Sequence, residues 1–323
     1  MAAMQLTELS IIIPVRNIEQ EISGILRSVA AQTADREAEF IVVDMGSADQ
    51  TVWEAVQLIK ELKLRGFVIQ NGDGTVSAAL NTGIQKASGD YITFIFARRL
   101  YHDFIVGYLD TAARTSADFV FGSVNDEVSR SAERHLISKA VRQENGPDYV
   151  KNILKGSLPI DISAVLIKRR FVIEKQIHFF DQCCHGYAEE FVFRCLLTAD
   201  CIAQSPTLMK RDTVYELKRG KQKPVGKNIF QHTDAMLRIM DLVKSGHRGD
   251  AELISLFERE KLPLTVMNGV DVMLKEGVGY NAVRGYLRLA GYDKLLLTGR
   301  QTDKALKHRV RVWQVIPWMY KVK

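Results

Sequence analysis

The sequence lacks any long apolar stretch. Apolar residues make up 46% of the 323 residues, yet no segment approaches the ~20 consecutive apolar residues that a membrane-spanning helix needs. Residues 1–8 contain no basic segment followed by an apolar core, so a secretory signal is not indicated. We therefore expect a globular protein with a substantial core that stays in the cytoplasm.

Cysteine is scarce, and its spacing excludes a common kind of metal site. Cys183, Cys184, Cys195 and Cys201 contain no Cys-x-x-Cys pair, and adjacent cysteines are awkward tetrahedral ligands. Zinc bound together with the nearby His185 stays open as an alternative. Free or buried thiols, which fit a reducing cytoplasm, are favoured.

Glycine-rich phosphate-binding motifs are missing as well. The first apolar run is not followed by the Gly-x-Gly-x-x-Gly of dinucleotide-binding folds, and the P-loop pattern Gly-x-x-x-x-Gly-Lys-[Ser/Thr] does not occur. A dinucleotide-binding domain therefore loses its main sequence support.

Charge is present but unevenly distributed. Residues 201–323 carry 23 lysines and arginines against 12 acidic residues, whereas residues 1–200 carry 21 against 26. The two parts thus have net charges of +11 and −5. This asymmetry indicates that the C-terminal part faces an anionic partner, and a solvated basic surface explains it equally well.

Apolar runs alternate with helical patterns in the first part of the chain. Strands are expected at 10–15, 39–44, 66–70, 90–96 and 118–122; helices are expected around Ile22, Ile25, Leu26 and Val29, around Val52, Val56, Ile59 and Leu62, and over 76–88. Because the strands are continuously apolar and their connections short, we predict a mostly parallel sheet flanked by helices. Ligands bind such sheets beyond the carboxyl ends of the strands.

From about residue 228 the pattern becomes helical. One apolar stripe is formed by Met236, Ile239, Met240 and Val243. Three weaker helical patterns follow, with glycine-containing breaks between them, over 251–260, 265–275 and 280–290. We therefore predict two domains, a sheet domain over residues 1–225 and a basic helical extension over residues 226–323.

Four ordered motifs resemble family 2 glycosyltransferases over roughly residues 8–200. They are Ser10-Ile-Ile-Ile-Pro-Val-Arg-Asn17, Ser28-Val-Ala-Ala-Gln-Thr33, Val43-Asp-Met-Gly-Ser-Ala-Asp-Gln-Thr51 and Asn81-Thr-Gly-Ile-Gln-Lys-Ala-Ser-Gly-Asp-Tyr-Ile92. The third is similar to the family's Val-Asp-Asp-Gly-Ser-x-Asp-x-Thr loop. The resemblance implies a GT-A fold that binds a nucleoside-diphosphate sugar.

The resemblance assigns Pro14, Arg16, Asn17, Asp44 and Ser47 to the nucleotide site. A carboxylate at a strand end supplies a charge-assisted acceptor for a ring N–H of a base such as uracil, the role implied for Asp44. The alternative is that Asp44 and Asp49 cap the following helix, and Ser47 or Asp49 is the favoured cap.

The Asp-x-Asp motif of the family is missing. Family members use these carboxylates to bind a divalent cation that bridges the donor diphosphate, but here the aligned residues are Phe96, Ala97 and Arg98, and Arg99 follows. An arginine cannot bind Mg²⁺ or Mn²⁺, because it stays protonated and offers no lone pair. The motif supports neither ion, so we expect no metal cofactor.

Three interpretations of Arg98 and Arg99 stay open. Their guanidinium groups can neutralise the diphosphate in place of a metal, assisted by the basic loop with Lys218, Arg219 and Lys221; that loop can equally be a mobile surface segment. Alternatively, the protein no longer turns over a donor and serves as a binding or scaffold partner. In the third interpretation both arginines face solvent or pair with acids.

Two later pieces, Phe180-Asp-Gln and His185-Gly-Tyr-Ala-Glu-Glu-Phe-Val-Phe-Arg194, are similar to the family's Phe-Asp-Glu followed by Gly-Glu-Asp-x-x-Phe-x-x-Arg. In that pattern the second acid is the general base. By this resemblance Glu190 is the base, with Glu189 beside it. An inverting transfer needs one carboxylate to deprotonate the attacking hydroxyl. The alternative is that both acids simply open a helix.

Residues 304–323 mix basic and aromatic side chains, including Trp313, Trp318 and Tyr320. This mixture suits an anionic membrane surface, while packing against the sheet domain or against a second subunit of a homo-oligomer explains the same aromatics. No recognised motif for binding nucleic acid accompanies the charge.

The combined prediction is an inverting glycosyltransferase in the assembly of polysaccharides or glycoconjugates. It would move a sugar from a nucleoside-diphosphate donor, with UDP favoured, to a glycan or lipid-linked acceptor, without a metal. We expect it in the cytoplasm or attached peripherally to the inner face of the membrane. The competing prediction is a catalytically silent glycosyltransferase-like subunit.

Overall fold

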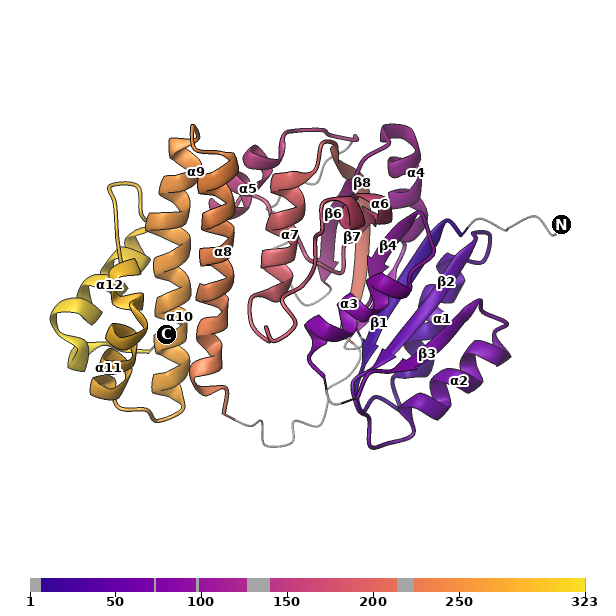
Figure 1. The fold of residues 1–323 in the computed structure, drawn as a ribbon, viewed down its shortest axis with the longest axis horizontal. Helices are drawn as coiled ribbons and strands as arrows, with labels where there is room; N and C mark the ends of the chain where they lie inside the picture. Colours follow the sequence, from indigo (N-terminus) through magenta and orange to yellow (C-terminus); the bar gives the residue numbers. More distant parts are fainter. Residues whose placement is uncertain (1–6, 73, 97–98, 127–139, 214–223, 323) are drawn as a thin grey trace.

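The computed structural model describes residues 7–72, 74–96, 99–126, 140–213 and 224–322. A sheet of eight strands occupies the first two thirds of the chain, and the described residues after it form helices and connections (Figure 1). The strands are β1 (Leu9–Val15), β2 (Ala38–Asp44), β3 (Gly66–Gln70), β4 (Tyr91–Phe94), β5 (Arg99–His102), β6 (Phe119–Asp126), β7 (Val165–Lys168) and β8 (Ile202–Thr213). The helices are α1 (Ile22–Gln32), α2 (Thr51–Glu61), α3 (Val76–Lys86), α4 (Ile105–Thr115), α5 (Gly146–Leu154), α6 (Arg169–Glu174), α7 (Tyr187–Thr198), α8 (Gln231–Gly246), α9 (Ala251–Leu256), α10 (Leu262–Lys275), α11 (Tyr280–Ala290) and α12 (Lys304–Val315).

The strands follow the order β3-β2-β1-β4-β7-β6-β8-β5 across the sheet. β1 is parallel to β2 and β4, β2 is parallel to β3, and β6 is parallel to β8. The antiparallel pairings between the described strands all involve β7 or β5. The predicted mostly parallel sheet flanked by helices is therefore confirmed.

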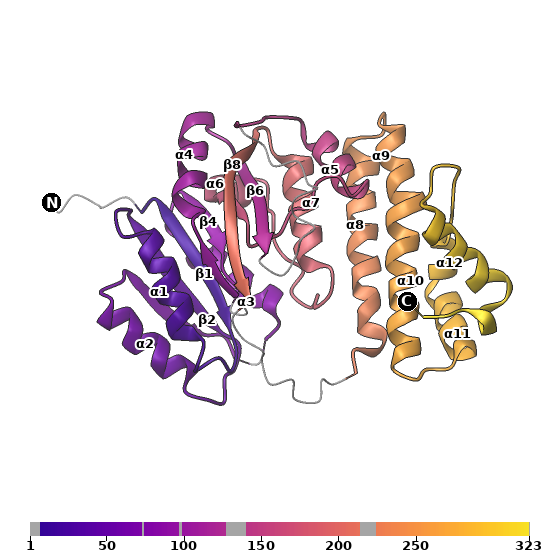
Figure 2. The same ribbon diagram turned by 180° about the vertical axis from the view of Figure 1, so that it is seen from behind.

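Helices cover both faces of the sheet, so the first strands are mostly apolar and carry apolar side chains on both faces. All seven residues of β1 are buried. Ile11 and Ile13 pack in one cluster with α1, α2 and α4, whereas Ile12 packs in the other with α3, α5 and α7. Helices α1 and α2 lie in front of the sheet in Figure 2 and behind it in Figure 1. The close approach of α3 requires Gly83, since a Cβ there would lie 2.3 Å from Cγ2 of Ile12.

The buried face of α2 differs from the predicted one. Ala55, Leu58 and Ile59 are buried, whereas Val52 and Val56 are only half-buried. The start of the helix is fixed by its neighbouring loops, because the hydroxyl of Thr51 accepts a hydrogen bond from the Ile18 N–H at 2.8 Å. This anchor rotates the helix by about one residue relative to the apolar pattern.

Helix α8 carries the predicted apolar stripe and packs on α7 of the sheet domain. All four residues of the stripe are buried: Met236, Ile239, Met240 and Val243. They share one core with Phe193 and with the sheet face that contains Ile12. The helical region thus continues the core of the sheet domain. Among the described residues, no helix combines the length and the apolar character that crossing a bilayer requires.

The predicted break between 260 and 265 is wrong. A π-helical turn, Phe257–Lys261, joins α9 directly to α10, so the helical path continues from Ala251 to Lys275. Pro263 stands in the first turn of α10, where its missing N–H is tolerated. A proline therefore occurs here without ending the helical path.

The aromatic residues of the C-terminal segment have different environments. Trp313 is 3% exposed and lies in a third core with residues of α10 and α11, not against the sheet. The Tyr320 hydroxyl donates a hydrogen bond to Asp271 Oδ1 at 2.7 Å. Trp318, in contrast, is 61% exposed. The segment is thus anchored on α10 while part of it faces solvent.

Candidate functional site

The loops after β1 and β2 meet at one edge of the sheet, as predicted. Val15, the last residue of β1, pairs with Asp44, the last residue of β2, and Asp44 pairs in turn with Gln70 of β3. The Met45 N–H donates to the Val15 carbonyl at 3.0 Å. The structure therefore brings together the predicted nucleotide-binding residues Pro14, Arg16, Asn17, Asp44 and Ser47.

Asp44 closes a turn and does not cap α2. It is 3% exposed, and its carboxylate accepts hydrogen bonds from the N–H groups of Gly46 (3.1 Å) and Ser47 (3.2 Å). Gly46 has a φ of +80°, which favours glycine. At the start of α2, Asp49 accepts instead from the Thr51 N–H at 3.0 Å. The Ser47 N–H also contacts Oδ2 at 3.2 Å, so the turn uses three of the about four lone-pair positions of the carboxylate and leaves one for a ligand.

Asn17 and Ser47 hold the two loops together. The Asn17 N–H donates to Ser47 Oγ at 3.0 Å, and the Ala48 N–H donates to Asn17 Oδ1 at 2.8 Å. Asn17 has a φ of +49°, a left-handed conformation that asparagine tolerates better than most residues. These hydrogen bonds therefore join the two loops that are predicted to contact the nucleotide into one structural unit.

The predicted diphosphate clamp is only partly within the described residues. Arg98, Lys218, Arg219 and Lys221 lie outside them. Arg99 opens β5, and its backbone pairs with Thr213, the last residue of β8. The described backbone thus brings Arg99 and Thr213 side by side.

Glu190 forms a two-pronged ion pair with a residue of α8. It is 5% exposed, and it accepts hydrogen bonds from Arg238 at 2.8 Å on Oε1 and 2.6 Å on Oε2, and from Arg194 at 3.0 Å. These hydrogen bonds raise the pKa of Arg238, whose guanidinium lies 4.4 Å from the ring centre of Phe180. Both oxygens of Glu190 are thus engaged, so action as a base requires Arg238 to withdraw.

Glu189 is held by a histidine and a lysine of the helical region. His232 Nε2 lies 2.7 Å from one of its oxygens, and Lys261 donates to the other. Burial opposes the ionisation of Glu189, but the hydrogen bonds and charges of His232 and Lys261 outweigh it and lower its pKa to about 2. A carboxylate with so low a pKa is a weak proton acceptor at neutral pH.

Both acids lie in the first turn of α7, so the expectation that they open a helix is confirmed. The general-base role of Glu190 stays a prediction. Aligned on Gly186, Phe191 and Arg194, the family pattern Gly-Glu-Asp-x-x-Phe-x-x-Arg places its second acid at Ala188. Glu190 lies two positions later, about 200° further around the helix.

No metal centre is formed by the side chains that the structure describes. No group of three or more His, Cys, Asp or Glu residues among them could hold an ion. All four cysteines are free thiols, and burial raises the pKa of Cys183 and Cys195. The alternative of zinc bound by cysteines and His185 thus gains no support from this part of the chain.

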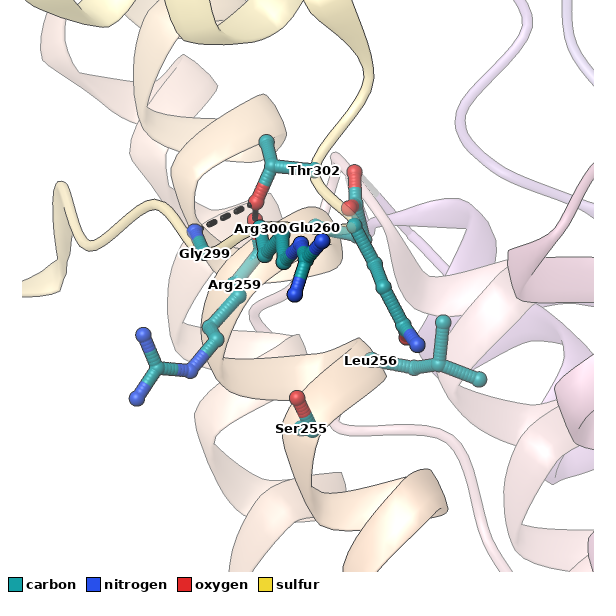
Figure 3. A pocket seen from close by; sticks show the side chains of 8 residues that line it. Ser255, Leu256, Arg259, Glu260, Gly299, Arg300 and Thr302 are labelled. Atoms are coloured by element: carbon teal, nitrogen blue, oxygen red, sulfur yellow. Dashed lines mark hydrogen bonds between the residues drawn. The ribbon is translucent and has the colours of Figure 1, made fainter.

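A separate cleft of about 300 Å³ lies in the helical region, beside the π-helical turn (Figure 3). Its wall is held by Thr302, whose hydroxyl accepts from the Gly299 N–H at 2.7 Å and donates to the Arg259 carbonyl at 3.0 Å. The cleft shares no lining residue with the loops after β1 and β2.

Residues 10–176 match the model of the family described as Glycosyl transferase family 2. The chain is 34% identical over 88 residues to Glycosyltransferase GlyA of Streptococcus pneumoniae, covering 27% of this chain and 12% of that protein. It is 32% identical over 123 residues to a PGL/p-HBAD biosynthesis glycosyltransferase of Mycobacterium bovis, covering 36% of this chain and 46% of that protein. The chain thus spans less than half the length of either relative.

Solved structures share the fold at low sequence identity. The structure of residues 1–349 of S. aureus TarS matches with a TM-score of 0.62 and 14% identity, covering 90% of this chain and 83% of that one. The same protein in complex with UDP-GlcNAc matches with a TM-score of 0.61 and 14% identity, covering 83% of this chain and 73% of that one.

Proposed function

This chain belongs to glycosyl transferase family 2, and we propose that it transfers a sugar from a nucleoside-diphosphate donor to a hydroxyl of a glycan or lipid-linked acceptor. The observation that carries the proposal is the joined loop body at the edge of β1 and β2, where Asp44 retains acceptor capacity. The two relatives are named glycosyltransferases. The TarS complex contains UDP-GlcNAc, which supports a UDP-linked donor.

The donor diphosphate is neutralised by arginine and lysine side chains and not by a metal ion. Phe96 and Arg98 stand where the family has the two acids of its metal-binding motif. Support comes from the pairing of Arg99, which follows Arg98 in the sequence, with Thr213, which precedes the basic residues 218–221 by a few positions. Fixed cations at this place would stabilise the charge that develops on the leaving diphosphate.

Transfer proceeds with inversion, and Glu190 remains the candidate base. An inverting step needs a carboxylate opposite the leaving group, because the attacking hydroxyl loses its proton as the new bond forms. Glu190 meets this need only when the Arg238 fork opens. Acceptor binding is then coupled to a rearrangement between α7 and α8.

Calorimetry with UDP tests the proposal directly. UDP is titrated into the full chain with Mn²⁺, with Mg²⁺ and with EDTA. We expect binding of equal affinity in all three, since the clamp contains no metal. Absence of binding at millimolar UDP would refute the nucleotide site, and binding that EDTA abolishes would refute metal independence.

A catalytically silent subunit is the second candidate. Glu189 and Glu190 are both engaged in ion pairs, and Ala188 occupies the position of the second acid in the family pattern. A silent subunit would bind UDP yet release no UDP from UDP-sugars, with or without glycan acceptors. A donor-hydrolysis assay on the same preparation separates the two candidates.

The protein attaches peripherally to an anionic membrane surface through α12 and the residues after it. Lys304, His308, Arg311 and Val315 are exposed and follow one face of α12 at helical spacing. Trp318 is 61% exposed directly after them. Basic side chains beside exposed tryptophan suit the headgroup region of such a surface.

A further inference from the structure

A groove of about 600 Å³ lies between α3 and α6, outside the loops already described. Its floor is apolar, because Ile84, Val172 and Ile177 are 7%, 1% and 4% exposed. Ile173 stands at the rim and is 52% exposed. Among the described residues that line the groove, none is a lysine or an arginine.

The rim carries polar groups with unused hydrogen-bonding capacity. Nδ1 of His178 lies 2.9 Å from the Gln176 carbonyl, which can only accept, so Nδ1 is the donor in this hydrogen bond and Nε2 is left for a ligand. Oδ1 of Asp181 accepts a hydrogen bond from the side-chain amide of Asn81 at 2.6 Å, which leaves Oδ2 to accept one from a ligand. The Gln85 amide is exposed and has no hydrogen-bond partner within the described part of the chain.

This chemistry selects a neutral ligand that is rich in hydroxyl groups. A diphosphate needs cations, and the described lining offers none. Amides such as those of Gln85 and Gln176 both donate and accept, which matches hydroxyl groups. Ile173 offers an apolar surface to the C–H face of a ring, as ligand sites commonly do. We propose that the groove binds a neutral sugar unit of the acceptor glycan, an assignment that rests on the proposed function.

Hydrogen bonds through α3 connect the groove to the nucleotide edge, which is the sheet edge formed by the loops after β1 and β2. The Asn71 N–H donates to the Asp44 carbonyl at 2.8 Å, and the Thr82 hydroxyl of α3 donates to Asn71 Oδ1 at 3.2 Å. The next residue toward the N-terminus of α3, Asn81, holds Asp181 of the groove. A sugar in the groove is therefore separated from the base-reading loop by one helix, as fits a remote unit of an extended acceptor.

Saturation-transfer NMR with the methyl glycosides of glucose, galactose and N-acetylglucosamine tests this site. We expect transfer from the protein to at least one glycoside. It should be lost in Ile173→Glu and in Gln85→Ala, which alter exposed side chains and should leave the fold intact by circular dichroism. Leu289→Glu, at an 88% exposed position of α11, is the matched control and should keep the signal.

Saturating UDP should leave the signal unchanged. The absence of transfer to all three glycosides, or transfer that persists in both groove variants, overturns the assignment. Transfer that UDP displaces places the sugar at the donor site and overturns it too. Failure of the proposed function is a different result, because it appears as absent UDP binding in calorimetry.

Discussion

Asp44 holds the turn after β2 through hydrogen bonds and is also the residue proposed to recognise the base of the nucleotide. Asp44→Asn keeps an oxygen acceptor for the N–H groups of Gly46 and Ser47 but removes the charge. We expect the affinity for UDP to fall about 10- to 100-fold, because a hydrogen bond to a charged group contributes about 1.5–3 kcal/mol. Calorimetry measures the change, with the exposed Asp35→Asn as control. Equal affinities of the two variants would reject the role of Asp44.

The proposed catalytic role of Glu190 and its structural role as partner of Arg238 can be tested by two measurements on one variant. Glu190→Gln should lower turnover by at least about 100-fold if Glu190 is the base, while the affinity for UDP stays unchanged. The free energy of unfolding should also fall by about 1–3 kcal/mol, because a buried charge-assisted fork is weakened. Glu174→Gln, which alters an exposed pair with Arg170, is the control for both readouts. Wild-type turnover in Glu190→Gln would show that the base assignment is wrong.

Glu189 makes stability depend on pH in the acid range. Burial opposes its ionisation, but His232 and Lys261 lower its pKa to about 2, below the ordinary 4.5. The ionised form therefore stabilises the fold above pH 4.5, and this contribution is lost as the pH falls toward 2. It amounts to at most about 3 kcal/mol, and to less in practice because the side chain is 29% exposed. Urea unfolding across this window should show a shallower pH dependence for Glu189→Gln, and parallel curves would contradict the assignment.

The contact between α7 and α8 can be probed by two glycines with the same backbone conformation. Gly186 has a φ of +83° and a Cβ there would lie 2.6 Å from Cδ2 of His232, whereas Gly277 has a φ of +84° and no atom within 4 Å. Both alanine variants incur the left-handed penalty of about 1–2 kcal/mol. Gly186→Ala should lose roughly 1–3 kcal/mol more, because α8 must shift. Equal losses in urea unfolding would show that α8 is not seated against Gly186.

The strands β1, β2, β3, β4 and β6 were predictable because both sheet faces are covered. A strand such as β1, apolar except for Ser10, then stands out in the sequence. Neither β5 nor α4 was predicted. The buried face of α2 was not predictable, since Thr51 fixes the helix through a loop distant in sequence. The continuity of α9 and α10 was not predicted, because a π-helical turn between them departs from the spacing of the α-helix.

The nucleotide edge was predictable for a general reason, as the ends of neighbouring parallel strands meet. The partners of the two acids were not. His232 and Lys261 lie 43 and 72 residues from Glu189, and Arg238 lies 48 residues from Glu190, so no local pattern connects them. The roles of the basic segments that contain Arg98 and residues 218–221 stay predictions.

The uneven charge of the chain gives the membrane proposal a salt-dependent test. The exposed face of α12 that carries Lys304 and Arg311 should bind vesicles that contain phosphatidylserine, and binding should weaken as the salt concentration rises. Arg311→Glu should weaken binding about fivefold or more, since one basic residue near an anionic surface contributes about 1 kcal/mol. Vesicle flotation measures this, with Arg170→Glu, whose side chain is 80% exposed in the sheet domain, as charge-matched control. Equal flotation of the two variants would exclude this face.

The core shared by α8 and the sheet has a consequence for how the chain folds during synthesis. Phe193 of α7 packs against Phe257, and the same core extends to Leu262. The side of α7 that faces α8 therefore stays uncovered until the ribosome has added roughly 60 further residues, about 3–12 s at ordinary translation rates. During that interval α7 exposes apolar surface, and its two acids lack their partners His232, Arg238 and Lys261. We expect this to be the period in which the chain depends most on chaperones.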